Sequence, residues 1–529
     1  MHARERYEGS YGLAVAIVLL GLCPNIVLAI AFVPLAGTIA HDLGTSEGTL
    51  ALAGALSNAG YAFGAVAAAQ LAQRYLQRNL FLCYEAMFVV GSVLAAVAPS
   101  VELFIAGRVL EGAATGFMLI SALPPLVTRF GVDRLPGTVV IVNIGLFGAS
   151  AVGPLIGGVA AQTGAWRAML GIAAALGAIG FAVAAVGYVH LVPPDPERRF
   201  DRPALGLALA STVLPFFAAA TVAAVGFASP LFLAPFLVGL AALVLLIVLQ
   251  YRKPDALMPV EALSTQLPVT GILVAMIAGA AFVTVVELVQ TFLATVAGQG
   301  PIAAAVQFWP MPVGLLVAAA AFGALFRTRW LPVLVNVGLV ALAGGSGVLL
   351  LLGAGSTGEV VSGASFLLGF GAGATVSPGL FLASFGVTSD KLARAFALVE
   401  LLRSEAAYAV APIVLYVATS RPTLAGGVRI GLAAMTALSL AGLGAALAIP
   451  ALSGARLRRP DLEGWLNEGR QALASPRTVV HVRPRAVDEV AAPFVPDGVR
   501  NQRHVQRLRE RRLRRRRAGS DDEWNETSR

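Results

Sequence analysis

The sequence predicts an all-α polytopic membrane protein, and three observations favour this fold class. Hydrophobic residues make up 57% of the 529-residue chain and charged residues only 13%, with a mean hydropathy of +0.79. Such a chain is too apolar for a water-soluble fold of this length. Apolar runs of about 20 residues, the length that spans a bilayer as a helix, recur along residues 11–450. Lysine and arginine gather in alternate connections between these runs, as in the cytoplasmic loops of multi-pass proteins.

Fourteen runs are long enough, so we expect 14 transmembrane helices. Their ranges are 11–35, 48–70, 79–98, 102–126, 137–160, 167–190, 204–226, 230–250, 268–293, 303–326, 331–354, 359–385, 393–419 and 427–450. The first run spans a bilayer and others follow it, so we expect it to remain as a helix and not to be a cleaved signal peptide. Prolines 215, 230 and 235 interrupt the pair 204–250, which leaves open a single re-entrant element there.

The basic residues orient the chain. With the N-terminus inside, the cytoplasmic loops contain Arg74, Arg78, Arg129, Arg134, Arg198, Arg199, Arg202, Arg252, Lys253, Arg327, Arg329, Lys391 and Arg394. The opposite loops contain only Arg167, Arg421 and Arg429. We therefore expect both termini in the cytoplasm, and residues 1–10 as a short cytoplasmic N-terminus.

The chain also repeats itself. "AQLAQRYLQRNL" at 69–80, after the second run, is echoed by "GALFRTRWLPVL" at 323–334, after the tenth. We expect two related six-helix bundles, 11–190 and 268–450, joined by a linker, 191–267, that holds two inserted helices. In transporters built from such repeats the substrate site lies near mid-membrane, where the halves meet.

Four motifs resemble those of the major facilitator superfamily, and within it the fourteen-helix drug:proton antiporters. The loop after the second helix keeps Leu71, Arg74 and Arg78 of the pattern G-x-L-x-D-R-x-G-R-[RK]. "RVLEGAATG" is similar to R-x-x-Q-G-x-G at Arg108 and Gly112, with Glu111 in place of Gln. "GASAVGPLIGG" at 148–158 matches the antiporter motif G-x-x-x-G-P-x-x-G-G at Gly153, Pro154, Gly157 and Gly158. "WRAML" follows, like the Trp-Arg that commonly begins the sixth helix of these proteins.

The resemblance implies export by alternating access, with Arg108 taking part in proton coupling and a cytoplasmic gate made by Leu71, Gln73, Arg74 and Arg78. Two departures matter. Gln73 stands where the family has Asp, so the gate's charge lock must be weaker or differently made. Asn25 stands where the first helix usually has an acidic residue. Since Asn cannot carry a proton, we expect Asn25 to line the substrate cavity and the proton carrier to lie elsewhere.

Ionisable residues within spans are costly and are functional candidates by default. They are Glu85, Arg108, Glu111, Glu287, Glu400, Arg403 and Glu405. Except for Glu85, we assign them to proton coupling. Glu85 lies nearer the cytoplasmic end of its helix, where it could reach Arg78 or Arg74.

Each of two pairs, Arg108 with Glu111 and Glu400 with Arg403, is spaced by three residues and so shares one helix face. For each pair a role in proton coupling and a purely structural role both remain open. Glu405 lies on a different face from Glu400. Glu287 has no basic residue within a helical turn. Burial without a partner favours its neutral form and suits proton exchange, although a cavity-lining or interfacial role is also open.

Two further features concern a candidate cavity and the packing of one helix. Phe292 and Trp309, near Pro310 and Pro312, suit an apolar drug cavity, or, for the Trp, an interfacial anchor. In the antiporter motif small residues recur every fourth position, at 145, 149, 153 and 157, which predicts close packing against another helix. Pro154 predicts a bend.

Residues 451–529 contain 18 Arg against 11 Asp or Glu. We expect a largely disordered cytoplasmic tail whose basic cluster at 507–517 lies on anionic lipid headgroups, with no role in nucleic-acid binding. No nucleotide loop, metal cluster or catalytic triad is present in the sequence, so we expect no cofactor, no metal and no enzyme activity.

The sequence therefore predicts a multi-pass protein of the cell membrane that exports small amphipathic or cationic compounds in exchange for protons. Two alternatives remain. The chain could export one endogenous metabolite or lipid, or it could be a transport-incompetent scaffold or sensor that uses its arginine-rich tail for binding.

Overall fold

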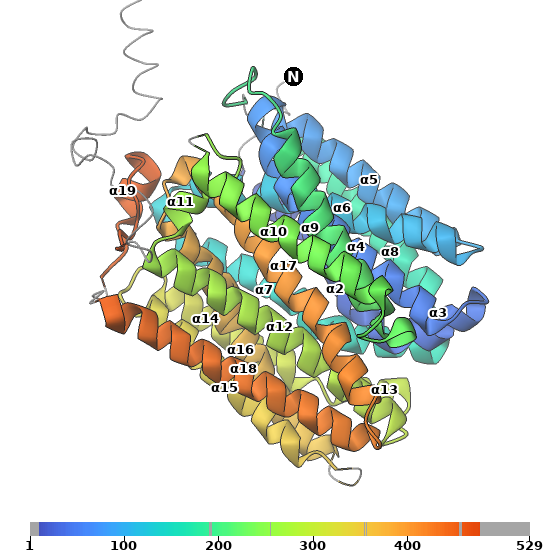
Figure 1. Cartoon of the computed structure of the whole chain (residues 1–529). Helices are drawn as coiled ribbons and strands as arrows, with labels where there is room; N and C mark the ends of the chain where they lie inside the picture. Colours follow the sequence, from blue (N-terminus) through green and yellow to red (C-terminus); the bar gives the residue numbers. More distant parts are fainter. Residues whose placement is uncertain are drawn as a thin grey trace, which may run out of the picture.

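The computed structural model (Figure 1) describes residues 10–189, 193–253, 255–353, 355, 357–453 and 458–476. All regular secondary structure in these ranges is helical. Fourteen stretches are long and apolar enough to cross a membrane, which confirms the predicted fold class and number of spans.

The helices fall into three groups along the chain. The first group is α2 (Tyr11–Ala31), η1 (Val33–Leu35), α3 (Ala36–Asp42), α4 (Glu47–Arg74), α5 (Gln77–Val97), α6 (Val101–Arg129), α7 (Gly131–Thr163) and α8 (Trp166–Gly187). The second is α9 (Arg202–Val225), α10 (Pro230–Arg252) and α11 (Val260–Leu263). The third is α12 (Gln266–Thr295), α13 (Pro301–Val306), α14 (Pro310–Leu325), α15 (Leu331–Val348), η2 (Leu349–Leu351), α16 (Thr357–Phe385), η3 (Ser389–Lys391), α17 (Leu392–Thr419), α18 (Leu424–Ser453) and α19 (Leu462–Asn467).

Two six-helix bundles make up the fold, and they use the same helix pairs. In the N-terminal bundle α2 packs on α7, α4 on α6 and α5 on α8; in the C-terminal bundle α12 packs on α17, α14 on α16 and α15 on α18. The halves meet where α4 packs on α17 and where α14 packs on α7. The repeat first indicated by the echoed loops is thus a repeat of helix packing.

Glycines set the closest approaches within each bundle. A Cβ at Gly112 of α6 would overlap the backbone of Ser57 on α4, and a Cβ at Gly369 of α16 would overlap the backbone of Met311 on α14. In membranes, where lipid gives little hydrophobic drive for helix association, such small-residue contacts are a main source of packing energy. The glycine of the "RVLEGAATG" motif therefore acts in packing.

The inserted pair consists of two separate helices, α9 and α10, so the re-entrant alternative is wrong. Pro215 lies within α9, whereas Pro230 is the first residue of α10, where its missing N–H costs no helical hydrogen bond. α9 packs against α4 of one half and α17 of the other, while α10 packs on α9. In Figure 1 the pair, coloured green, runs beside α17.

Two predicted spans are interrupted in the structure, whereas the others differ from the predicted ranges only by a few residues at their ends. The first ends at Ala31, and the chain continues through η1, which contains Pro34, into α3. Trp166 fixes α3, because its indole Nε1 donates a hydrogen bond to Asp42 Oδ2 at 2.8 Å; this bond lowers the pKa of the Asp42 carboxyl by stabilising its ionised form. The tenth span is broken into α13 and α14, and α14 begins at Pro310.

Two ends of the molecule are named below. The basic end carries the connections that follow α4, α6, α8, α10, α14 and α16, and the opposite end carries α3 and α13. That the basic end faces the cytoplasm remains a prediction.

Candidate functional site

A cavity lies between the two halves. It is lined by α2, α4, α6 and α7 of the N-terminal bundle and by α16 and α17 of the C-terminal bundle, and about 740 Å³ within it is not filled by atoms. Most lining side chains are apolar, and the polar or charged ones are Asn25, Asn58, Tyr61, Ser150, Ser377, Glu400, Arg403 and Tyr408. We call this space the central cavity. Asn25 lines it, and its predicted role in substrate binding stays a prediction.

One side of the central cavity is an ion pair. Arg403 donates from Nη2 and Nε to Glu400 Oε2 at 2.6 and 3.0 Å, and the two side chains are only 13% and 8% exposed. Their three-residue spacing on α17 puts both on the same face, as predicted. Tyr61 of α4 donates to the same Glu400 oxygen at 3.1 Å, so this cluster joins the two halves.

Two tyrosines of this cluster were not predicted as site residues. Tyr61 approaches Glu400 from a position 339 residues earlier in the chain, and no local pattern indicates that contact. Tyr408 lies five residues beyond Arg403 on α17 and also lines the cavity. A hydroxyl-bearing aromatic side chain in the middle of an apolar span is the one sequence signal that could have marked them.

The structure does not bring Phe292 and Trp309 to the central cavity. Phe292 is 2% exposed and belongs to the apolar core of the C-terminal bundle. Trp309 is 58% exposed just before α14, a position typical of interfacial anchors. The sequence placed both in the cavity, and the structure corrects this. Phe292 is buried because α12 packs against α16, α17 and α18, and Trp309 lies where the tenth span is broken between α13 and α14.

Arg108 and Glu111 form a second buried pair, away from the central cavity. They are 2% and 0% exposed, their side chains are joined by a hydrogen bond, and Ser92 of α5 donates to Glu111 at 2.5 Å. The guanidinium also lies 4.3 Å from the centre of the Phe32 ring, which favours the cation. Since α6 reaches the cavity only from Leu119 onwards, this pair is separated from it by two turns.

Glu287 and Glu405 occupy different surroundings. Glu287 is half-buried on α12, a helix that packs against α17. Glu405 is half-buried on α17, and its Oε1 is buried without a hydrogen-bond partner among the described residues. Of the six proposed coupling residues, Glu400 and Arg403 line the central cavity and the other four do not.

The antiporter motif packs in two directions. A Cβ at Gly153 would lie 2.7 Å from the Ile30 Cβ, and one at Gly157 would overlap the Ala31 carbonyl, so this face of α7 lies directly on α2. The adjacent Gly158 faces the other half, where its Cβ would lie 2.8 Å from the Pro301 carbonyl oxygen. α7 is a continuous α-helix through Pro154. The motif thus places α7 between its own bundle and α13.

At the basic end the four predicted gate residues lie around the connection from α4 to α5. Arg78 donates to the Ala185 carbonyl at 2.5 Å, Arg74 lies 5.2 Å from the centre of the Phe200 ring, and the Gln73 carbonyl accepts from the Asp195 N–H at 3.0 Å. Leu71 is half-buried at the end of α4. Among the described residues neither arginine forms an ion pair, in keeping with the missing motif aspartate.

Other basic residues form contacts between distant segments at the basic end. Arg327, in the second copy of the echoed loop, donates to the Val132 carbonyl and, at 3.1 Å, to Asp133 Oδ1 of α7. Arg198 binds Asp255 at 2.8 Å, which joins the connection before α9 to the connection after α10.

The first part of the predicted tail is ordered. Within residues 458–476, Trp465 of α19 is fully buried; its Nε1 donates to the Val387 carbonyl at 2.9 Å and its ring packs edge-on against Phe385. The Pro476 carbonyl accepts from the Gln266 N–H at 3.0 Å. This segment covers the basic end of the C-terminal bundle, whereas the basic cluster at 507–517 lies outside the described residues.

We predict that Trp465→Ala releases this segment. The substitution removes a fully buried indole, a loss of about 3–5 kcal/mol locally, so trypsin should cut after Arg470 much faster than in wild type. Limited proteolysis of the purified protein followed by mass spectrometry measures this. Trp330→Ala, which changes a tryptophan that is 47% exposed, serves as the control, and equal cleavage of both variants would contradict the prediction.

Comparison with known proteins shows which proteins this chain resembles. Residues 18–206 match the family described as Major Facilitator Superfamily. An uncharacterized MFS-type transporter of Bacillus subtilis, YubD, is 27% identical over 266 residues, 49% of this chain and 51% of the relative. The multidrug resistance protein B homolog of Mycobacterium tuberculosis strain H37Rv is 26% identical over 302 residues, 56% of this chain and 54% of the relative. The chain thus spans about half the length of the curated relatives it matches.

The fold also matches solved structures. The human organic anion transporter MFSD10 (TETRAN) superimposes with a TM-score of 0.60 at 13% identity, covering 83% of this chain and 100% of that chain. Within the described residues no group of His, Cys, Asp or Glu could hold a metal ion. The family match over residues 18–206, the relatives and the shared fold confirm the predicted resemblance to the Major Facilitator Superfamily.

Proposed function

We propose that the chain is a proton-coupled antiporter of the cell membrane that exports small amphipathic or cationic compounds by alternating access. The central cavity is the substrate site in this proposal. The names of the similar proteins support it, since they include a multidrug resistance protein B homolog and a drug efflux pump, JefA, both of Mycobacterium tuberculosis.

The observation that carries the proposal is the Glu400 cluster. Glu400 uses one oxygen, Oε2, for both Arg403 and Tyr61, within a cavity whose other walls are mostly apolar. An apolar wall with one carboxylate suits an amphipathic cation. A bound cation competes with Arg403 for this carboxylate, and a bound proton removes its charge; either event weakens the contact with Tyr61.

This competition provides a physical basis for coupling. Tyr61 belongs to the N-terminal half and Glu400 to the C-terminal half, so the occupancy of the cavity changes a bond that holds the halves together. Alternating access is relative motion of two such repeats about a central site. Glu287 of α12 and Glu111 in the N-terminal bundle are the proposed proton carriers.

Proton-driven transport in inside-out vesicles tests the proposal. A panel of fluorescent cationic and neutral amphipathic compounds is offered with an imposed pH gradient, and both compound uptake and proton release are recorded. We expect substrate-evoked proton flux in wild type and a loss of about 100-fold in Glu287→Gln and Glu111→Gln, the lower range of what a positioned proton-transfer group contributes.

Glu359→Gln is the matched control, because Glu359 is exposed in the first turn of α16. Normal coupling in both carrier variants would contradict the assignment of carriers. No substrate-evoked flux in wild type across the whole panel would contradict antiport and favour a metabolite or lipid exporter, or a scaffold.

A further inference from the structure

Glu85 of α5 is a buried carboxyl that plays no part in the proposed mechanism. It is 0% exposed, and both carboxyl oxygens are buried without a hydrogen-bond partner among the described residues. The sequence suggested that Glu85 could reach Arg78 or Arg74, but it contacts neither. Arg78 instead donates a hydrogen bond to the Ala185 carbonyl. A carboxylate without donors is unfavourable in an apolar interior, so this geometry favours the protonated form.

Two glycines make room for this side chain. A Cβ at Gly180 of α8 would lie 2.7 Å from Glu85 Oε1, and one at Gly21 of α2 would lie 3.1 Å from the same oxygen. Any larger residue at either position would displace the carboxyl. Glu85 is therefore accommodated where α2, α5 and α8 meet, within the N-terminal bundle and outside the central cavity.

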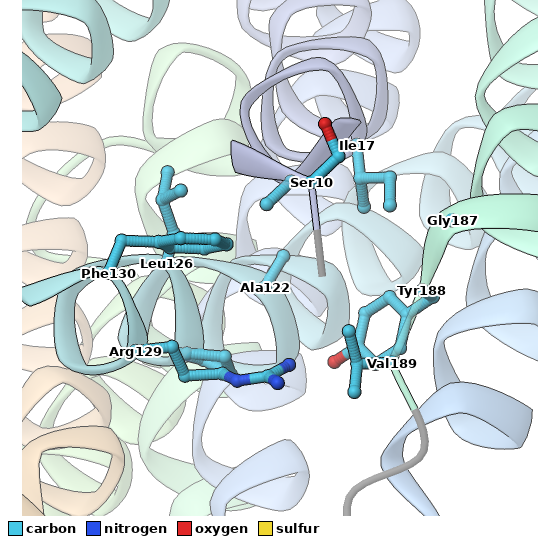
Figure 2. Close-up of a pocket in the computed structure, with 11 residues that line it drawn as sticks. Ser10, Ile17, Ala122, Leu126, Arg129, Phe130, Gly187, Tyr188 and Val189 are labelled. Atoms are coloured by element: carbon cyan, nitrogen blue, oxygen red, sulfur yellow. The ribbon is translucent and has the colours of Figure 1, made fainter. Parts of the chain in front are cut away.

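A small pocket opens at the basic end of the same bundle, and Glu85 is not among its lining residues. Figure 2 shows it between the start of α2 and the ends of α6 and α8, with Ser10 and Ile17 on one side, Ala122 and Arg129 on another, and Tyr188 beside them. Ile17 lies one turn before Gly21 on α2, and Ala122 lies one turn beyond Met118, whose sulfur is also close to Gly21. The floor of the pocket is thus about one helical turn, roughly 5.4 Å along the axes, from the carboxyl.

Few other titratable groups surround Glu85 on the helices packed against it. They are Tyr84 and Arg78 on α5, Cys23 on α2, the Arg108–Glu111 pair two turns away on α6, Arg129 of α6, which lines the pocket, and Tyr188 after α8. Tyr188 donates to the Ser121 carbonyl at 2.5 Å and Cys23 to the Gly145 carbonyl at 3.3 Å. Each of these two groups has its own partner, so proton exchange at Glu85 depends on water in the pocket.

We propose that Glu85 is a proton-binding site of the N-terminal bundle, filled from the basic end through this pocket and separate from the central cavity. A hydronium ion supplies the proton: one of its O–H bonds breaks to leave water as one O–H bond forms on the carboxylate, and on release water takes the same proton back as hydronium. Binding of the proton is independent of any substrate; only its use in transport rests on the proposed function.

Infrared difference spectroscopy of the full-length protein in liposomes tests the site. Wild type titrated between acid and alkaline pH should show the carbonyl stretch of a protonated carboxyl, and Glu85→Gln should lose that band. Glu102→Gln, which changes an exposed glutamate of α6, should keep it. Glu85→Asp should show a shifted band, which keeps the test valid even if the Gln variant folds poorly.

A second variant tests the path. Ala14→Phe fills the pocket without touching Glu85, so the band should keep its amplitude. Hydrogen–deuterium exchange at the carboxyl should slow by about tenfold, which corresponds to a barrier about 1.4 kcal/mol higher. An unchanged band in Glu85→Gln, or a band that does not respond to pH, would overturn the site. Unchanged exchange in Ala14→Phe would overturn the path. A titrating Glu85 band in a protein without substrate-evoked proton flux would overturn the proposed function and leave this site standing.

Discussion

Replacing Gly157 with leucine is expected to reduce coupled export about 100-fold, the loss that a misplacement of about 1 Å can cause, while the protein still inserts and can be purified. A side chain at this position overlaps the Ala31 carbonyl, so α7 must move away from α2. The next residue of α7, Gly158, packs against α13 of the other half. The displacement of α7 therefore reaches the contact between the halves. Uptake in inside-out vesicles at matched protein levels measures the effect.

Gly148→Leu on the same helix is the matched control. A Cβ at Gly148 would meet only the Ile144 side chain of its own helix, at 3.9 Å. Both substitutions gain about the same helix propensity, up to roughly 1 kcal/mol relative to glycine, so any difference in export reports the contact with α2. Equal export by both leucine variants would show that the close approach of α7 to α2 is not required.

The second large effect is expected for Arg403→Gln. It leaves the Glu400 carboxylate without its cation at a site where that side chain is 8% exposed, and breaking a buried pair from one side costs roughly 3–5 kcal/mol. We expect a clearly lower unfolding temperature in detergent and no measurable export. Arg421→Gln changes an exposed arginine near the opposite end and should leave both unchanged.

The double variant separates stability from function. Arg403→Gln combined with Glu400→Gln removes both charges, so most of the lost stability should return. Export should stay lost, because the carboxylate proposed to bind cation or proton is gone. A double variant no more stable than Arg403→Gln alone would contradict the view that the unpaired Glu400 causes the instability, and restored export would contradict the role of Glu400 in the site.

Local patterns predicted the features that one helix determines. The spans follow from apolar length, and the pairs Arg108–Glu111 and Glu400–Arg403 follow from the three-residue spacing. The small-residue stripe of α7 also predicted close packing, although it could not identify α2 as the neighbour. In each case the physical cause lies within a few turns of a single helix.

Contacts between distant helices were not predictable in this way. Tyr61 meets Glu400 because the repeat places α4 on α17. Phe292 points into a bundle core because α12 is surrounded by α16, α17 and α18, a fact that depends on topology and not on the neighbours of Phe292 in sequence. The basic neighbours of Glu85 suggested an ion pair, whereas Gly21 and Gly180, on two other helices, accommodate a carboxyl without one.

The inserted hairpin of α9 and α10 makes the two flanks of the molecule different. Two repeated bundles would leave two equivalent flanks between them, one at α4 and α17 and the other at α7 and α14. α9 lies along the first flank, where Phe216 packs against the cavity residue Tyr408 with ring centres 6.3 Å apart. From the bilayer, this flank is therefore one helix thicker than its counterpart. The two flanks therefore present different surfaces to the bilayer: α9 covers the contact between α4 and α17, whereas α7 and α14 meet without an inserted helix beside them among the described residues.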